Sequence, residues 1–161
     1  MSQAILEQLR ARFGEAIIET HNFRGDETAI VRREQIVPLC QWLKATPGIE
    51  CNMLIDLCGV DYSERAERFE VVYHLYSTTQ KHRVRVKVRL AGEAPQVDSV
   101  VAVWPAANWF EREAFDLFGI TFVGHPHLKR LLTFDEFEGH PLRKDYPVNR
   151  RPKIPTPDPL M

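Results

Sequence analysis

The sequence has 161 residues and lacks most of the features that mark an enzyme with its own redox centre or a membrane protein. It holds only three cysteines, Cys40, Cys51 and Cys58, and no Cys-x-x-Cys pair, so four thiolates for an iron–sulfur cluster are not present. Their odd number and apolar surroundings indicate reduced thiols of a cytosolic compartment. No apolar run approaches the roughly 18 residues of a membrane span. We also expect no secretory signal at the N-terminus.

Motifs for nucleophilic or phosphate chemistry are missing as well. The sequence contains no Gly-x-Ser-x-Gly turn and no glycine-rich phosphate loop. A formal net charge of −1 gives no general attraction for a polyanionic partner. Hydrophobic residues make up 44% and charged residues 27% of the chain, which is typical of a globular domain. The length fits one domain with a real core.

The periodicity of apolar residues predicts an α+β domain over residues 1–146. Its clearest pattern is a hairpin in which residues 69–76 and 83–90 alternate in polarity. A loop at 78–81 would place Leu75 opposite Val84 and make one face wholly apolar. The remaining expected elements are helices over residues 5–13, 34–46 and 107–118, and strands over 16–20, 28–31 and 51–57.

These elements predict a mixed or antiparallel sheet with helices packed mainly on one face. The strand at 51–57 is nearly all apolar, and we expect it to be buried on both faces. Residues 147–161 are proline-rich with almost nothing to bury, so they predict an extended C-terminal tail. We expect this tail to lie along a neighbouring protein.

One strand of the hairpin carries a cationic row, defined by Arg83, Arg85, Lys87 and Arg89. Such a row on one sheet face has two interpretations, a platform for nucleic acid or a solvated or protein-covered face. The second is favoured, because paired aromatic residues of an RNA-recognition sheet are missing and the net charge is near zero. We therefore expect no nucleic-acid partner.

The most informative segment is residues 108–146, here called the charged block. On the helix predicted at 107–118, Glu111 falls in the middle of the apolar face, whereas Trp109 falls on the polar face. A buried carboxylate requires partners to offset its desolvation. For Glu111 the alternatives are a basic side chain of this chain or a group across an interface. Trp109 is either shielded by the following loop or an anchor for another protein.

Three histidines in the charged block raise the alternative of a stand-alone metal-dependent enzyme. His125, His127 and His140 lie among several acidic residues, which is enough ligands on paper. However, His125 and His140 each occur in a Gly-His-Pro tripeptide, which is typical of turns rather than of a ligand-bearing helix. Structural turns are the favoured interpretation.

The spacing within the charged block resembles a known family. The pattern comprises Glu111-Arg112-Glu113, Asp116-Leu117-Phe118, His125, Lys129 and Leu131-Leu132, followed by the run from Glu138 to Pro147. It is similar to the family of the 30-kilodalton connecting subunit (the C subunit) of respiratory complex I, the proton-translocating NADH-quinone oxidoreductase. Only His127 departs from the expected pattern, where an acidic or amide residue is usual.

The resemblance implies a non-catalytic subunit of the peripheral arm, with no active site and no cofactor of its own. FMN, iron–sulfur clusters and quinone would be held by partner subunits, chiefly the large quinone-site subunit and nearby iron–sulfur subunits. The chain would lie on the cytoplasmic side of the bacterial inner membrane and meet the membrane only through the complex. The interface residues implied are Trp109, Glu111, Arg112, Glu113, Asp116, His125, His140, Arg143, Lys144, Asp145 and Tyr146.

The electron donor of the parent complex stays open at this point. Related subunits serve plastoquinone-reducing, deazaflavin-linked and hydrogenase complexes, and the donor would bind elsewhere in each. The charges support a docking role, because residues 111–140 carry six acidic and three basic side chains whereas 143–153 carry one acidic and five basic. Such a division orients partners more than it adds affinity.

Overall fold

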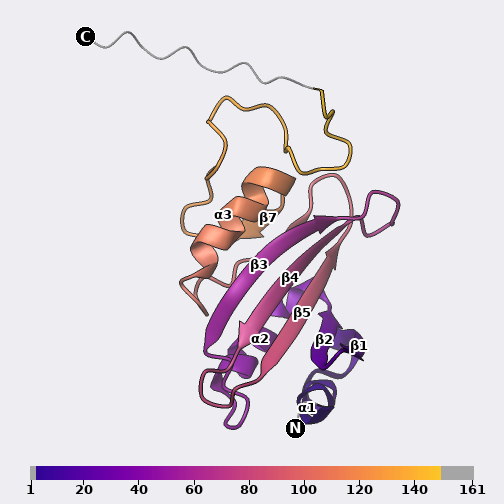
Figure 1. The fold of residues 1–161 in the computed structure, drawn as a ribbon, viewed down its shortest axis with the longest axis vertical. Coiled ribbons are helices and arrows are strands. Elements are labelled where there is room, and N and C mark those ends of the chain that lie inside the picture. The colour runs from indigo at the N-terminus through magenta and orange to yellow at the C-terminus, as the bar shows by residue number, and fades with distance from the viewer. Residues whose placement is uncertain (1–2, 150–161) are drawn as a thin grey trace, which may run out of the picture.

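A computed structural model describes residues 3–149 and confirms the α+β class, with a mixed sheet at its centre (Figure 1). The sheet has five strands in the order β1 (Ile17–Phe23), β2 (Asp26–Val31), β5 (Arg83–Leu90), β4 (Phe69–Tyr76) and β3 (Met53–Asp61). The β2 and β5 strands pair in parallel, and the other three pairs are antiparallel. Of the expected tail, residues 150–161 lie outside the described part of the chain.

The helices are α1 (Gln3–Phe13), α2 (Ile36–Ala45) and α3 (Ala107–Phe118), with short 3-10 turns at Gly14–Ala16 and Arg33–Gln35. Leu9 of α1 and Leu39 and Leu43 of α2 are fully buried and share one core with the sheet. The α2 helix starts at Ile36, which places Pro38 in the first turn, where its missing N–H breaks no hydrogen bond of the helix.

The register of the hairpin is the one that the sequence predicts. Leu75 pairs with Val84, and Phe69 pairs with Leu90, so every second residue of both strands points into the core. The inward residues Val71, Tyr73, Val86 and Val88 are completely buried. Each side chain of this size contributes about 1.5–3 kcal/mol through its transfer from water, which makes the hairpin the main apolar platform of the domain.

The strand predicted at 51–57 was misjudged, because it is not buried on both faces. It runs from Met53 to Asp61 as the edge strand β3, and burial alternates along it, with Leu54 and Leu57 buried but Met53 and Ile55 exposed. As the edge strand, β3 pairs with β4 alone in the described sheet. A second, two-stranded parallel sheet of β6 (Gln96–Asp98) and β7 (Thr121–Val123) was not predicted. Three residues are too few to show a strand period.

The α3 helix packs against β3, and Gly59 permits the close approach. A Cβ atom on Gly59 would lie 2.7 Å from Cδ2 of Phe118 and 3.2 Å from Cδ1 of Ile120. Figure 1 shows α3 beside β3, with the segment after β7 running above the helix and across the end of the sheet. The charged block is therefore placed where α3 meets β3.

Gly59→Ala is expected to weaken the packing of α3 on the sheet. The added methyl group forces the ring of Phe118 to move, and overpacking of this kind costs about 1–3 kcal/mol. Urea denaturation measures the loss in the free energy of unfolding. The matched double variant Gly59→Ala with Phe118→Leu makes room for the methyl group and recovers part of that loss; an equal or greater loss in the double variant would contradict the contact.

Candidate functional site

Asp116, on the third turn of α3, organises the loop that follows β7. Its carboxylate is fully buried, and Oδ2 accepts hydrogen bonds from the backbone N–H groups of Leu131, Leu132 and Thr133 at 3.0, 2.7 and 2.9 Å. Oδ1 accepts from Nη1 of Arg130 at 2.8 Å and from the hydroxyl of Thr133. One carboxylate thus holds a turn of four consecutive residues against the helix.

Asp116 is an ionised structural anion rather than a general base. Burial by itself raises the pKa of Asp116, but the hydrogen bonds from Thr133, Leu132 and Arg130 outweigh burial and hold that pKa well below the usual range. A carboxylate with this many donors is strongly favoured in its charged form. It has no spare lone pair directed to solvent, since its side chain is inaccessible.

Two arginines extend the contact to the rest of the loop. Nη2 of Arg130 donates to the carbonyl oxygens of Phe137 and Gly139 at 2.8 and 3.2 Å. The side chain of Arg112, predicted as part of an interface, is almost buried and donates to the carbonyl oxygens of Lys129 and Arg130 at 3.2 and 3.1 Å. Charge-assisted bonds from Arg112 therefore tie the loop to α3, and those from Arg130 tie two parts of the loop to each other.

Glu111 is buried, as the helical wheel predicts, but the partners that the structure gives it are neutral groups of the same chain. Oε2 accepts a hydrogen bond from the hydroxyl of Ser99 at 2.6 Å, and Oε1 accepts one from the N–H of Val100 at 2.8 Å. Among residues 3–149 it forms no salt bridge, so the expected alternative of a basic partner is wrong for this part of the chain. Burial raises the pKa of Glu111 to about 7, and the two hydrogen bonds offset only part of this effect.

The C-terminal end of α3 is capped by the segment around residue 140. The last carbonyl groups of a helix have no partner within it. Here Nδ1 of His140 lies 2.9 Å from the carbonyl oxygen of Asp116. The N–H of Leu142 donates to the carbonyl oxygen of Leu117 at 3.1 Å. Nε of Arg143 donates to the carbonyl oxygen of Phe118 at 2.6 Å. The cation of Arg143 also opposes the negative end of the helix dipole.

Gly119 makes this cap possible. It follows α3 in a left-handed conformation with φ +70°, which is common for glycine directly after a helix. A Cβ atom there would lie 2.5 Å from both Nε2 of His140 and Nη2 of Arg143. A side chain at this position would displace both capping groups.

The exit of the charged block is anchored to the end of β3 by Asp61. This buried carboxylate accepts from Nε and Nη2 of Arg68 at 2.8 and 2.6 Å and from the N–H of Lys144 at 2.8 Å. The hydrogen bonds from Arg68 lower the pKa of Asp61 far below its usual range, against the opposing effect of burial. Nη1 of Arg68 reaches Asp145 at 2.8 Å, so one arginine bridges the strand end and the exit.

The histidines of the charged block do not come together. Nε2 of His125 lies 3.2 Å from the carbonyl oxygen of Asn108, and its Nδ1 accepts from the N–H of His127 at 3.0 Å, whereas His140 caps α3. None of the three belongs to a group of metal-ligating atoms within the described residues. The alternative of a metal-dependent enzyme built on them has no geometric support.

Other side chains of the block face outward. Trp109 is 60% exposed, so the following loop does not shield it, and the guanidinium of Arg112 lies 5.0 Å from its ring centre. Leu132 and Leu142 are 63% and 50% exposed, and Glu113 is exposed as well. Tyr146 stacks on Phe137 with ring centres 6.0 Å apart. The block is therefore rigidly held from inside while it presents apolar groups to the outside.

Comparison with known proteins decides the family. The sequence model of the family described as "Respiratory-chain NADH dehydrogenase, 30 Kd subunit" matches residues 29–152, which include the charged block. The chain belongs to this 30-kDa subunit family. It is 49% identical over 144 residues to the C subunit of NADH-quinone oxidoreductase from Roseiflexus sp. strain RS-1, covering 89% of this chain and 83% of the relative. With the same kind of protein from Maricaulis maris it shares 55% identity over 124 residues, covering 77% and 62%.

Two solved structures share the fold of this 30-kDa family member. A trypsin-resistant fragment of Nqo5 superposes with a TM-score of 0.68 at 34% sequence identity, covering 78% of this chain and 98% of the fragment. A chain of the membrane-bound sulfane sulfur reductase, an archaeal respiratory membrane complex, gives a TM-score of 0.76 at 23% identity, covering 91% and 86%. The second likeness concerns the fold alone.

The cationic row is largely neutralised in the structure. Arg85 pairs with Asp26 at 3.1 Å, Lys87 with Glu70 at 2.8 Å, and Arg89 with Glu19 at 3.2 Å. Arg83 lies over the ring of Tyr76. Phosphate groups would have to compete with these carboxylates, which weakens the interpretation of the row as a nucleic-acid platform. Across residues 3–149, no helix is long and apolar enough to cross a membrane.

Several residues that hold this site carried no signal in the sequence. They are single polar residues outside any periodic pattern, namely Asp61, Arg68, Ser99, Arg130 and Thr133. Their partners lie up to 83 residues away along the chain. Only the preference of aspartate for a turn marks Asp61, which also accepts from the N–H of Ser63 at 2.9 Å.

Asp116→Asn is expected to release the loop after β7. The amide keeps one acceptor oxygen but leaves Arg130 without its counter-charge, and breaking one side of a buried pair costs on the order of 3 kcal/mol. Urea denaturation at pH 7 measures the fall in the free energy of unfolding. Asp135→Asn, in an exposed part of the same loop, serves as the matched control and shifts it by less than about 0.5 kcal/mol. Equal effects of the two substitutions would contradict the assigned role.

Glu111 is expected to make the protein less stable as pH rises. Its folded pKa of about 7 lies above the ordinary value of 4.5, so its stabilising contribution is complete below pH 4.5 and is lost as pH rises through 7. The loss amounts to about 3 kcal/mol at full ionisation. Glu111→Gln keeps an acceptor for Val100 and cannot ionise, so its free energy of unfolding falls less than that of the wild type between pH 5 and pH 8.

Denaturation curves of the two proteins at pH 5, 6, 7 and 8 measure this difference. Burial also raises the pKa of Glu27 to about 7. Glu27 is present in both proteins, so its contribution to the pH dependence of stability cancels in the comparison. Glu113→Gln, an exposed position on the same helix, is the control and follows the wild type. Parallel pH profiles of wild type and Glu111→Gln would show that Glu111 does not titrate in this range.

Proposed function

We propose that this chain is a non-catalytic subunit of the peripheral arm of an NADH-quinone oxidoreductase, where it docks against the quinone-site subunit. The observation that carries the proposal is that the charged block bonds ionisable groups within the chain and exposes apolar groups on its surface. Its conspicuous ionisable groups, Glu111, Asp116 and Arg143, are bonded within the chain. Its outward groups Trp109 and Leu132 are apolar and exposed. That is the composition of an interface core with charges removed from it.

The proposal assigns the redox chemistry to neighbouring subunits. FMN, the iron–sulfur clusters and quinone would be bound there, and this chain would hold no cofactor for electron transfer. Its lack of four thiolates and the bonding of His125 and His140 to the backbone support this assignment. Nearby subunits with iron–sulfur clusters would be the second set of partners.

We further propose that the chain is peripheral to the membrane, on the cytoplasmic side of the bacterial inner membrane. It would reach the bilayer only through its partner subunits. The relatives are named as subunits of NADH-quinone oxidoreductases. The second candidate is an equivalent subunit in a related complex with another electron donor.

Arg143 takes a different place from the one that the sequence suggested. The resemblance implies that Arg143 is an interface residue. The structure shows its side chain bonded to Phe118 and lying over the ring of Phe69 at 5.0 Å. Substitution of Arg143 therefore disturbs the cap of α3 directly, and Trp109 is the cleaner probe of docking.

Trp109→Ala is expected to weaken assembly and leave the fold unchanged. Removal of an exposed side chain alters the free energy of unfolding by less than about 0.5 kcal/mol, whereas loss of a tryptophan anchor costs an interface about 2 kcal/mol or more, roughly 30-fold in affinity. Co-purification of the quinone-site subunit with the tagged chain, quantified by mass spectrometry, measures the second effect. Thermal melting of the isolated chain measures the first.

Phe23→Ala is the matched control. Phe23 is 63% exposed and has a guanidinium, that of Arg24, 5.2 Å from its ring centre, so it reproduces the local setting of Trp109 on strand β1. Its substitution leaves co-purification at the wild-type level. If Trp109→Ala retained full co-purification, or if it melted the domain, the docking assignment would be wrong.

A further inference from the structure

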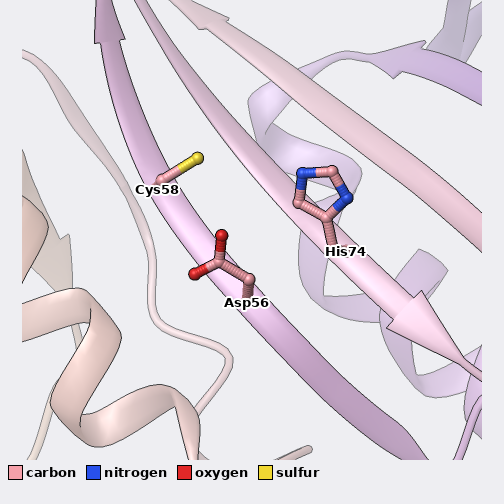
Figure 2. A group of neighbouring side chains, drawn as sticks. All are labelled: Asp56, Cys58 and His74. Carbon is pink, nitrogen blue, oxygen red and sulfur yellow. The ribbon is translucent and has the colours of Figure 1, made fainter.

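Asp56, Cys58 and His74 form a group of potential metal ligands that is separate from the charged block. Figure 2 shows the three side chains on the neighbouring strands β3 and β4. One ligand atom from each, a carboxylate oxygen, the Sγ atom and an imidazole nitrogen, lies within 4.8 Å of the other two. All three side chains are partly exposed, so an ion can reach them from solvent.

The register of the two strands produces this convergence. Residues two apart on a strand point to the same face, which places Asp56 beside Cys58. His74 on β4 is the direct partner of Asp56 on β3. A β-bulge between Leu54 and Asp56 shifts the register there, and bulges of this kind re-aim the side chains that follow. The three ligands thus meet on the face of the sheet opposite the buried core.

We propose that Asp56, Cys58 and His74 bind a divalent transition-metal ion of the zinc type. Thiolate and imidazole select such borderline-soft ions over magnesium or calcium, which take oxygen ligands. Three protein ligands leave a fourth tetrahedral position for water. Zinc bonds of about 2.0–2.3 Å place tetrahedral ligand atoms roughly 3.3–3.8 Å apart. Side-chain rotations that bring the ligand atoms about 1 Å closer together therefore complete the site.

The electrostatic surroundings set the affinity. Arg85 lies directly opposite His74, and Lys87 lies two residues further along β5, on the same face of the sheet. Both cations repel a bound metal ion, but this repulsion is reduced because Arg85 is paired with Asp26 and Lys87 with Glu70. The carboxylate and the thiolate supply two negative charges, which balance a divalent ion. We therefore expect binding by a preformed but modest site rather than by a tight structural zinc centre.

The protonation states fit this chemistry. Burial, with help from Arg85, lowers the pKa of His74, so the neutral imidazole that ligates a metal prevails at pH 7. Burial raises the pKa of the Cys58 thiol, with Asp56 and Glu113 adding to the effect. The ion must therefore displace one proton from sulfur, and binding releases that proton to solvent.

Titration of the full 161-residue chain with Co²⁺ alone, in a buffer with a phosphine reductant, tests the proposal. One equivalent of cobalt is expected to produce the near-ultraviolet absorption of a thiolate-to-cobalt charge transfer. Cys58→Ser abolishes this absorption, and Asp56→Asn and His74→Gln each weaken binding at least about tenfold. His127→Gln, an exposed histidine outside the group, is the matched control and retains the wild-type affinity.

A second readout uses the wild-type chain, so it does not depend on the folding of any variant. Excess Zn²⁺ is expected to slow the alkylation of Cys58 by iodoacetamide at least about tenfold, as peptide mass spectrometry measures, because the bound thiolate is no longer free. Cys40 and Cys51 are buried and serve as internal controls that stay unmodified in the folded chain. Absence of a saturable cobalt signal, or unchanged alkylation of Cys58 with zinc, would overturn the proposal.

Discussion

The buried carboxylate of Asp116 is the constraint on which the functional part of this chain depends. It gathers the amides of Leu131, Leu132 and Thr133 and the guanidinium of Arg130 around one side chain of α3. The loop after β7 has only a small aromatic cluster within it, in which Phe137 contacts Phe134 and Tyr146, and Asp116 ties the loop to the helix. The helix in turn is fixed by Gly59, whose missing side chain lets Phe118 approach the sheet. The order of dependence therefore runs from sheet to helix and from helix to loop.

Two buried carboxylates of the same helix have different structural roles. Asp116 accepts from five donor groups and is held ionised, whereas Glu111 has two neutral donors and a pKa raised to about 7. Asp116 fixes the loop that follows the helix in the chain, and Glu111 fixes Ser99 and Val100, which precede it. The charged residues of the block are thus explained mainly by internal bonding, whereas Trp109 is left exposed.

Periodic features of this fold could be predicted from the sequence, and isolated polar contacts could not. The register of β4 with β5 follows from strict alternation, and the burial of Glu111 follows from its place on the helical wheel. The partners of Glu111 and Asp116 are single residues that no period marks. The edge position of β3 depends on the strand order, which apolar content does not reveal. The group of Asp56, Cys58 and His74 needed both the pairing of β3 with β4 and its bulge.

Amide hydrogen exchange of the isolated chain tests the central claim most directly. If Asp116 organises the loop before any partner binds, the amides of Leu131, Leu132 and Thr133 exchange at least about a hundredfold more slowly than in an unstructured peptide. The amide of Val100, held by Glu111, is the internal reference for a bonded loop amide. Exchange of residues 131–133 at unprotected rates, with Val100 protected, would show that partner subunits rather than Asp116 order the loop.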